Sequence, residues 1–230
     1  MAGVRIDALS AGYAGRVVLH GISARLPSAS ITAIAGPNGS GKSTLLGAVA
    51  GVVPPGSGSV VLPGGTRPAF VVQRSAVSDR LPITVRETVA MGRWAHSGPW
   101  RRLSEEDHVI VADALARLGI ADLARRRLGS LSGGQRQRAL VAQGLAQRAD
   151  VLLLDEPTTG LDGPAREAIT DALAGEAARG AAVVHVTHDL AEADRADHCL
   201  LLGKGRLLAE GPPAGVLTAD ALDTAWGLRR

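Results

Sequence analysis

A glycine-rich stretch near the N-terminus has the residue types and spacing that bind phosphate. Residues 36–44 contain the pattern G-x-x-x-x-G-K-S. Glycines let backbone N–H groups wrap closely around an anion, and the N-terminus of a following helix adds positive potential. In this pattern the lysine, here Lys42, reaches the outer phosphates, and the next hydroxyl, here Ser43, binds Mg²⁺. The candidate contacts are Gly36, Pro37, Asn38, Gly39, Ser40, Gly41, Lys42, Ser43 and Thr44.

Two carboxylates lie directly after a run of aliphatic residues. Residues 151–154 are Val-Leu-Leu-Leu, and Asp155 and Glu156 follow them. The carboxyl end of a buried strand is where open α/β sheets bind their ligands. Asp155 can hold Mg²⁺ through its water shell, and Glu156 can polarise an attacking water. An Asp-Glu pair alone is more often a helix cap or a salt-bridge partner, but together with the phosphate loop it predicts a Mg²⁺-dependent nucleoside triphosphatase.

Alternating strands and helices are expected to position these residues. Residues 31–35, 151–154 and 182–186 have the composition of buried strands, and helix-compatible segments separate them. This alternation predicts an α/β fold built on a parallel sheet. Short runs bounded by Gly or Pro predict an antiparallel β layer beside that sheet, at residues 4–9, 22–26, 60–62 and 69–72.

The middle of the chain has a different pattern. Helical periodicity recurs there with no strand between the segments, at residues 84–92, 104–118 and 133–147. We therefore expect a single domain over residues 1–230 with a helical insertion. The expected division is an α/β core at about residues 1–74 and 136–217, a helical subdomain at about 75–135 and a short C-terminal helix at about 218–230.

Composition and charge exclude several classes of protein. The 230 residues are 46% hydrophobic, which is enough for a full core. Aromatic residues make up only 2%, too few for a surface on which bases stack. The net charge is +3 and the sequence has no long run of like charges, so we expect no nucleic-acid partner. Cys199 is the only cysteine, so no internal disulfide is expected. We expect no secretory signal, because residues 1–9 lack a basic flank followed by an apolar stretch. We expect no membrane span, because every aliphatic run is far shorter than about 18 residues.

The histidines have a simpler interpretation than metal binding. His185 and His188 are three residues apart on or just after a strand, which places them on opposite faces, and His185 is expected in the core or at its edge. His198 and Cys199 are adjacent, so we expect no transition-metal site. Residues 93–94 and 100–102 combine Trp with Arg and could dock a partner, meet lipid headgroups or pack within the helical part.

A second glycine-rich helix start gives the sequence a family resemblance. The residues before the helix near 136 are Ser132, Gly133, Gly134 and Gln135, following Leu131. Alone they are only a capped helix preceded by a flexible turn, but they resemble the signature sequence of ATP-binding-cassette (ABC) ATPases. The other motifs of that family stand in order on both sides of this segment. Tyr13 resembles its adenine-stacking aromatic, Gln73 its glutamine between the Mg²⁺ site and the helical subdomain, Asp162 its short loop after the carboxylates, and His188 its switch histidine.

The resemblance covers about residues 4–215 and implies the ABC ATPase fold with ATP and Mg²⁺ as its ligands. It implies a head-to-tail dimer, of two copies or with a related subunit, in which each ATP lies between the Lys42 loop of one protomer and residues 132–135 of the other. Membrane-spanning permease subunits, an extracytoplasmic substrate-binding protein and a location at the cytoplasmic face of the membrane are implied as well. The sequence departs from the family pattern at Val72, at the short segment 63–68 and at Gln143, none of which is expected to contact phosphate.

The partner-facing region resembles two importer branches. Residues 73–77, 81–85, 91–93 and 128–134 resemble zinc and manganese importers, whereas residues 92–106 share features with siderophore, haem and cobalamin importers. The resemblance thus implies metal import, with zinc first and manganese second, and iron-chelate import as the alternative. A soluble cassette ATPase usually has two cassettes or a long coiled coil, and a regulator without turnover would lack Glu156 or His188; neither pattern fits this sequence.

Overall fold

The computed structural model describes residues 3–13, 15–65, 67–72, 82–98 and 102–227. Its larger sheet has six strands in the order β5-β6-β7-β3-β8-β9. The first five run parallel and β9 is antiparallel to β8. The strands are β3 (Ser30–Ala35), β5 (Ala69–Val71), β6 (Val151–Asp155), β7 (Ala182–Val186), β8 (His198–Gly203) and β9 (Arg206–Gly211).

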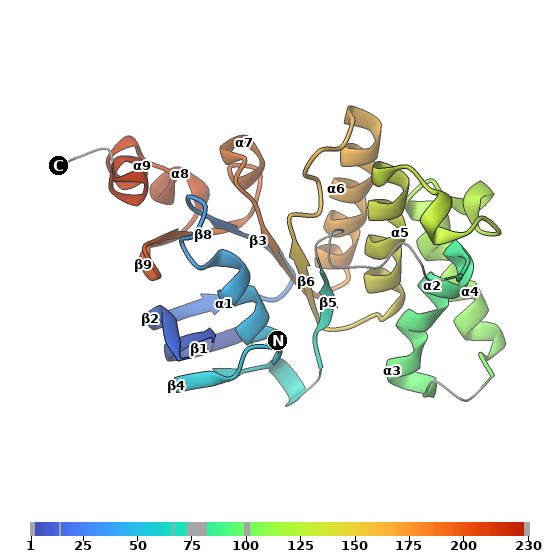
Figure 1. The fold of residues 1–230 in the computed structure, drawn as a ribbon, viewed down its shortest axis with the longest axis horizontal. Coiled ribbons are helices and arrows are strands. Elements are labelled where there is room, and N and C mark those ends of the chain that lie inside the picture. The colour runs from blue at the N-terminus through green and yellow to red at the C-terminus, as the bar shows by residue number, and fades with distance from the viewer. Residues whose placement is uncertain (1–2, 14, 66, 73–81, 99–101, 228–230) are drawn as a thin grey trace.

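A smaller antiparallel sheet lies beside the larger one (Figure 1). It has the order β2-β1-β4, with β1 (Val4–Tyr13), β2 (Arg16–Leu26) and β4 (Pro55–Val61). Helix α1 (Lys42–Val49) packs against both sheets, because Leu45 and Leu46 share one apolar cluster with Leu9 of β1 and Leu153 of β6. The predicted α/β architecture, with an antiparallel layer beside a mainly parallel sheet, is confirmed.

One predicted strand belongs to the other sheet. Residues 69–72 were expected in the antiparallel layer, but β5 pairs parallel with β6 at the edge of the larger sheet. That prediction is wrong because a three-residue strand has too few alternating positions to indicate its partner, and β6 lies far along the chain. Strand β9, which follows β8 through a tight turn, was not predicted at all.

Two long helices cover one face of the larger sheet. These are α5 (Gly133–Ala146) and α6 (Gly163–Ala178), whose apolar cluster includes Leu152 and Leu154 of β6. Since successive side chains of a strand point to opposite faces, α1 on the Leu153 face and α5 on the Leu152 face lie on opposite sides of the sheet. Figure 1 shows α1 and α5 separated by β6 in this way.

The remaining helices of the middle region pack on the outer side of α5 (Figure 1). They are α2 (Val85–Ala90), α3 (Trp94–Ser97) and α4 (Glu105–Arg117), with 3₁₀ turns at Met91–Arg93, Ala121–Leu123 and Leu128–Ser130. Helices were expected at residues 84–92 and 104–118, and capping boxes at Thr84 and Ser104 start α2 and α4 there. Arg93 is buried and bonds to Asp107 at 2.7 Å, which supports the packing alternative for this residue, while Trp94 is 41% exposed.

Three short helices complete the chain. They are α7 (Leu190–Ala193), α8 (Pro213–Val216) and α9 (Ala219–Trp226), and α8 and α9 pack against β8. A closing helix was expected at about residues 218–230, and α9 occupies residues 219–226 of that range. Across the described ranges, no helix is both long and apolar enough to cross a lipid bilayer.

Candidate functional site

The glycine-rich loop joins the end of β3 to the start of α1 and has the backbone of a phosphate cradle. Gly36, Gly39 and Gly41 have φ values of 145°, 78° and 102°. A Cβ atom on Gly36 would lie 2.2 Å from the carbonyl oxygen of Leu202, so only glycine fits there. Gly41 is the N-cap of α1 and gives this helix no side-chain cap, although each of α2, α4, α5, α6 and α9 has one. The first N–H groups of α1 are thus available to an anion.

Lys42 is held over this loop. Its side chain is buried, and Nζ donates to the carbonyl oxygens of Gly36 at 2.8 Å and Pro37 at 3.0 Å. Burial lowers the pKa of Lys42, while the negative charges of Glu156 and Asp155 oppose this lowering. The ammonium group is therefore within electrostatic reach of both carboxylates.

Ser43 and Asp155 come together although they are far apart in the sequence. The Ser43 hydroxyl donates to Asp155 Oδ1 at 3.1 Å. Asp155 ends β6, and its burial raises the pKa of its carboxyl group, as does the charge of Glu156 to a smaller extent. The hydrogen bond from Ser43 and the charge of Lys42 act in the opposite direction. The site thus offers a hydroxyl and a carboxylate oxygen side by side, which are ligand types that Mg²⁺ prefers.

Glu156 faces His188 in a strained turn. Its φ of 48° lies in the left-handed region, which costs a residue with a side chain about 1–3 kcal/mol. Glu156 Oε1 lies 3.6 Å from His188 Nδ1, and Thr159 Oγ1 donates to Glu156 Oε2 at 3.2 Å. The fold thus brings together two residues that the sequence offers as candidates.

A pocket of about 320 Å³ lies beside the phosphate loop. Its described lining is Gly36, Pro37, Asn38, Glu156, His188 and Trp226. Trp226 is at the end of α9, a segment that the sequence analysis credited with no chemistry. Ala225 packs into the cluster around β8, and the next residue, Trp226, reaches the pocket. No motif marks this residue, because its place at the site depends on how the last helix packs.

The second glycine-rich helix start has a local structural role. Ser132 Oγ accepts from the N–H of Gln135 at 3.3 Å, and Gln135 Oε1 accepts from the N–H of Ser132 at 3.1 Å. Gly133 and Gly134 form the first turn, and a Cβ on Gly134 would lie 3.4 Å from Leu161 Cδ2. None of residues 132–135 is among the described residues that line the pocket beside the phosphate loop. Within one chain, these residues and Lys42 belong to helices on opposite faces of the sheet.

Two further predicted site residues, Asp162 and Tyr13, are not among the described residues that line this pocket. Asp162 is the N-cap of α6 and accepts from the N–H of Ala165 at 3.0 Å. Tyr13 ends β1 and is 54% exposed. The next strand of the same hairpin, β2, packs against the phosphate loop, because a Cβ on Gly41 would lie 2.7 Å from Leu19 Cδ2. Gln73 lies outside the described residues.

His185 is confirmed as a core residue. It is 4% exposed on β7, and burial lowers its pKa while the charge of Glu192 opposes this. His198 Nε2 lies 3.4 Å from Glu210 Oε1. In the part of the chain that the structure describes, no group of three or more His, Cys, Asp or Glu side chains is placed to hold a metal ion.

Several known proteins resemble this chain over most of its length. The family model for ABC transporters matches residues 19–159. The manganese transport system ATP-binding protein MntB of Bacillus subtilis (strain 168) is 36% identical over 232 residues, covering 98% of this chain and 93% of the relative. The hemin import ATP-binding protein HmuV of Nocardia farcinica is 42% identical over 223 residues, covering 92% and 76%. A solved ABC transporter in an inward-facing conformation has a TM-score of 0.87 and 29% identity, covering 99% of this chain and 90% of that one.

Proposed function

Because this chain belongs to the ABC transporter family, we propose that its phosphate loop and the carboxylates of Asp155 and Glu156 form the site at which it hydrolyses ATP. Proteins of this family hydrolyse ATP with Mg²⁺, and this chain is an ATPase of that kind. The observation that carries the proposal is the hydrogen bond from Ser43 to Asp155, 3.1 Å long. It joins the start of the phosphate-binding helix to the end of the carboxylate-bearing strand.

The residues present fit Mg²⁺. The Ser43 hydroxyl and the Asp155 carboxylate would hold the ion, and Gln73 is a further proposed ligand by family resemblance. When bound, the ion neutralises negative charge on the phosphate oxygens. One carboxylate suffices, since Mg²⁺ keeps several waters and takes its other ligands from the substrate phosphates.

The chain's own groups supply the rest of the chemistry. Backbone N–H groups of residues 39–44 and the Lys42 ammonium bind and orient the phosphates. Glu156 accepts a proton from the attacking water, and His188, 3.6 Å from Glu156, positions the terminal phosphate beside it. Tyr13 stacks on the adenine ring. Trp226 closes one side of the pocket in which the terminal phosphate lies.

A second copy of the chain completes the site in this proposal. Residues 132–135 form a glycine-rich helix start that lies on the other face of the sheet from α1. An anion can bind such a helix start, and a head-to-tail partner would bring it to the phosphates held by Lys42. Asp162, just after the buried Leu161, would lie near the same junction. We also propose the division into an α/β core at residues 1–74 and 136–217 and a helical subdomain at 75–135, which transmits movement to a permease.

The proposed cargo is a metal ion, zinc first and manganese second. Support comes from the motif residues 81–85, 91–93 and 128–134 and from the similarity to a manganese transport protein. The alternative is a siderophore, haem or cobalamin importer, which the similarity to a hemin import protein supports. In either case the chain would work at the cytoplasmic face of the membrane, with permease subunits and an extracytoplasmic substrate-binding protein.

Elemental analysis of cells tests this cargo. Cells lacking the protein, grown in metal-limited medium, are compared with cells complemented by wild type or by Glu156→Gln. We expect a selective fall in zinc or manganese that only wild type restores. If zinc and manganese are unchanged and iron supplied as a chelate fails to accumulate, the iron-chelate alternative replaces the metal-ion proposal.

A further inference from the structure

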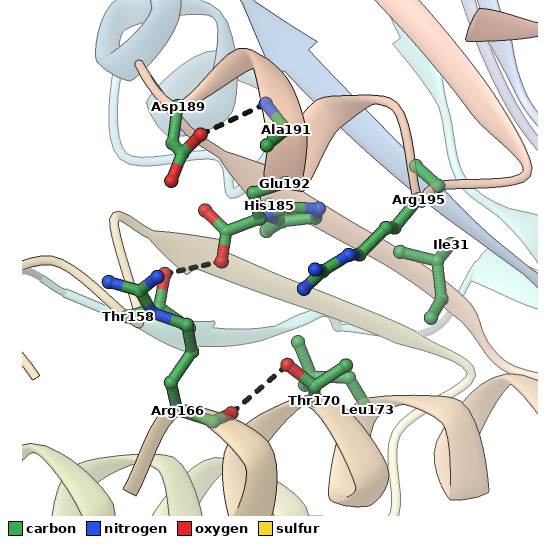
Figure 2. A pocket seen from close by; sticks show the side chains of 11 residues that line it. Ile31, Thr158, Arg166, Thr170, Leu173, His185, Asp189, Ala191, Glu192 and Arg195 are labelled. Atoms are coloured by element: carbon green, nitrogen blue, oxygen red, sulfur yellow. Dashed lines mark hydrogen bonds between the residues drawn. The ribbon is translucent and has the colours of Figure 1, made fainter. Parts of the chain in front are cut away.

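A small pocket with both polar and apolar walls lies between α6, β7 and α7, next to the loops that carry the proposed catalytic residues (Figure 2). It encloses about 90 Å³, and the Glu192 carboxylate of α7 lies at its centre. Glu192 Oε1 accepts a hydrogen bond from Thr158 Oγ1 at 2.5 Å, drawn in Figure 2, and Oε2 accepts one from Thr187 Oγ1 at 2.5 Å. Both oxygens of one carboxylate are thus used by two different loops.

These loops carry the two residues that face each other at the hydrolysis site. Thr158 is two residues after Glu156, and Thr187 directly precedes His188. Both threonines are buried, at 5% and 3% exposure. Short hydrogen bonds to an ionised carboxylate are about twice as strong as bonds between neutral groups. Glu192 therefore ties the Glu156 turn to the His188 loop through two part-buried hydrogen bonds.

The carboxylate itself is firmly placed. Asp189 caps α7 by accepting from the N–H of Ala191 at 2.9 Å, and the Asp189 N–H donates to Thr187 Oγ1 at 3.0 Å. Ala193 of α7 is fully buried against β3. The helix is thus anchored to the sheet, independently of the Glu156 turn.

Several charged and titratable groups surround Glu192. Arg166 of α6 and Arg195, just after α7, extend into the same pocket from opposite sides (Figure 2). His185 lies in the pocket wall, with a buried Nδ1 that has no hydrogen-bond partner among the described residues. Asp189 is the other acidic group at the pocket, and its carboxylate is turned to the N–H of Ala191.

We propose that Glu192 is a positioning residue for ATP hydrolysis: its two hydrogen bonds hold the Glu156 turn and the His188 loop at a fixed separation. The proposal rests on the proposed roles of Glu156 and His188. Glu156 needs such support because its left-handed backbone conformation is strained and would relax if the turn were free. A small displacement of a reacting group can lower turnover by about a hundredfold.

Steady-state ATPase kinetics of the full chain test the proposal. We expect Glu192→Ala to lower kcat by about tenfold to a hundredfold while KM for ATP changes by less than about threefold, because nucleotide contacts remain. Thr158→Val and Thr187→Val each remove one hydroxyl and keep the side-chain shape, so each should lower kcat by a smaller factor. In the Glu192→Ala background neither threonine variant should lower kcat further, since the shared interaction is already lost.

Glu176→Ala is the matched control for the loss of a carboxylate through the same substitution on another helix. Glu176 is 3% exposed in α6 and pairs with Arg117 at 2.7 Å and with Arg179, away from the pocket. This variant should lower the melting temperature and leave kcat unchanged. The positioning role is wrong if Glu192→Ala keeps kcat within about twofold of wild type while Glu156→Gln is inactive. If Glu192→Ala does not fold, the same criterion applies to both threonine variants. Wild-type turnover by Glu156→Gln would instead overturn the proposed site itself.

Discussion

At the scale of single residues, Lys42 shows how the phosphate loop combines burial with charge. Its ammonium group donates hydrogen bonds to two carbonyl oxygens of its own loop. It also lies within electrostatic reach of Asp155 and Glu156. Burial alone would lower its pKa and weaken its charge, and the carboxylates oppose that effect. A charged side chain with few alternative positions is what a phosphate-binding group needs.

Replacing Lys42 by Ala should weaken ATP binding and abolish turnover, because the outer phosphates lose their only lysine contact. Nucleotide binding by equilibrium fluorescence and phosphate release measure the two effects. Lys204→Ala removes the only other lysine, which is exposed, and should behave as wild type. Hydrolysis by Lys42→Ala at near wild-type rate would contradict the assignment of the loop.

The site residues differ in how far the sequence could predict them. Lys42, Ser43, Asp155, Glu156 and His188 belong to local patterns, and the fold brings all five to one end of the sheet. Trp226 and Glu192 belong to no pattern that sequence reasoning used. Their positions follow from how α9 and α7 pack on the sheet, which is a tertiary property.

At the scale of elements, similar helix starts have different proposed roles. Ser132 caps α5 in a capping box, as Ser104 caps α4. A capping box alone therefore does not distinguish a structural helix start from one that binds nucleotide. In the proposed dimer, the start of α5 differs from the start of α4 because the second copy places it against the phosphates of ATP.

The variant Ser132→Arg should block the composite site while the chain stays folded. A cap loss costs about 1 kcal/mol, which a domain of this size tolerates, but the arginine fills the space proposed for phosphate. Ser104→Arg is the control, since it disrupts an equivalent cap on α4. We expect ATP hydrolysis to be lost only in Ser132→Arg, and normal turnover by that variant would refute the shared site.

An ion pair between elements gives the helical region a pH-dependent stability. Arg93 bonds to Asp107 at the start of α4 and to the carbonyl oxygen of Ala146 at the end of α5. The bond from Arg93, with the N–H of Ser104, lowers the pKa of Asp107 to about 2. A carboxyl whose pKa is lowered on folding stabilises the folded state above its unfolded pKa, and this contribution disappears as pH falls.

We therefore expect the free energy of unfolding to decrease as pH falls from about 4 to about 2, through the range between the two pKa values of Asp107. Asp107→Asn should be less stable than wild type at neutral pH and should show a smaller decrease over that range. Urea denaturation at a series of pH values measures both. Equal pH dependence of the two proteins would show that Asp107 does not carry this effect.

Strands were predicted less completely than helices at this scale. Each predicted helix of the middle region begins at a residue whose side chain caps it, so its start is encoded locally. The partner of β5 is encoded by β6, which follows in the sequence only after the helical region. A short strand with a distant partner carries no local signal for its pairing.

At the scale of the whole molecule, the two glycine-rich helix starts belong to helices on opposite faces of the larger sheet, because successive side chains of β6 point to opposite faces. Leu153 faces α1 and Leu152 faces the cluster of α5 and α6, so one chain presents its phosphate loop and residues 132–135 from opposite faces of one sheet. The order of motifs along the sequence could suggest a shared site. Because the two helix starts lie on opposite faces of the sheet, we do not expect a single copy of the chain to complete that shared site.

The central claim is that ATP is hydrolysed between two copies of this chain, with Glu156 as the base. Glu156→Gln keeps the size of the side chain but cannot accept the proton, so ATP should bind and persist. Size-exclusion chromatography with ATP and Mg²⁺, combined with phosphate release, measures both parts of the claim. We predict a stable dimer with very slow turnover, whereas a monomer under all nucleotide conditions, or wild-type turnover, would contradict the account.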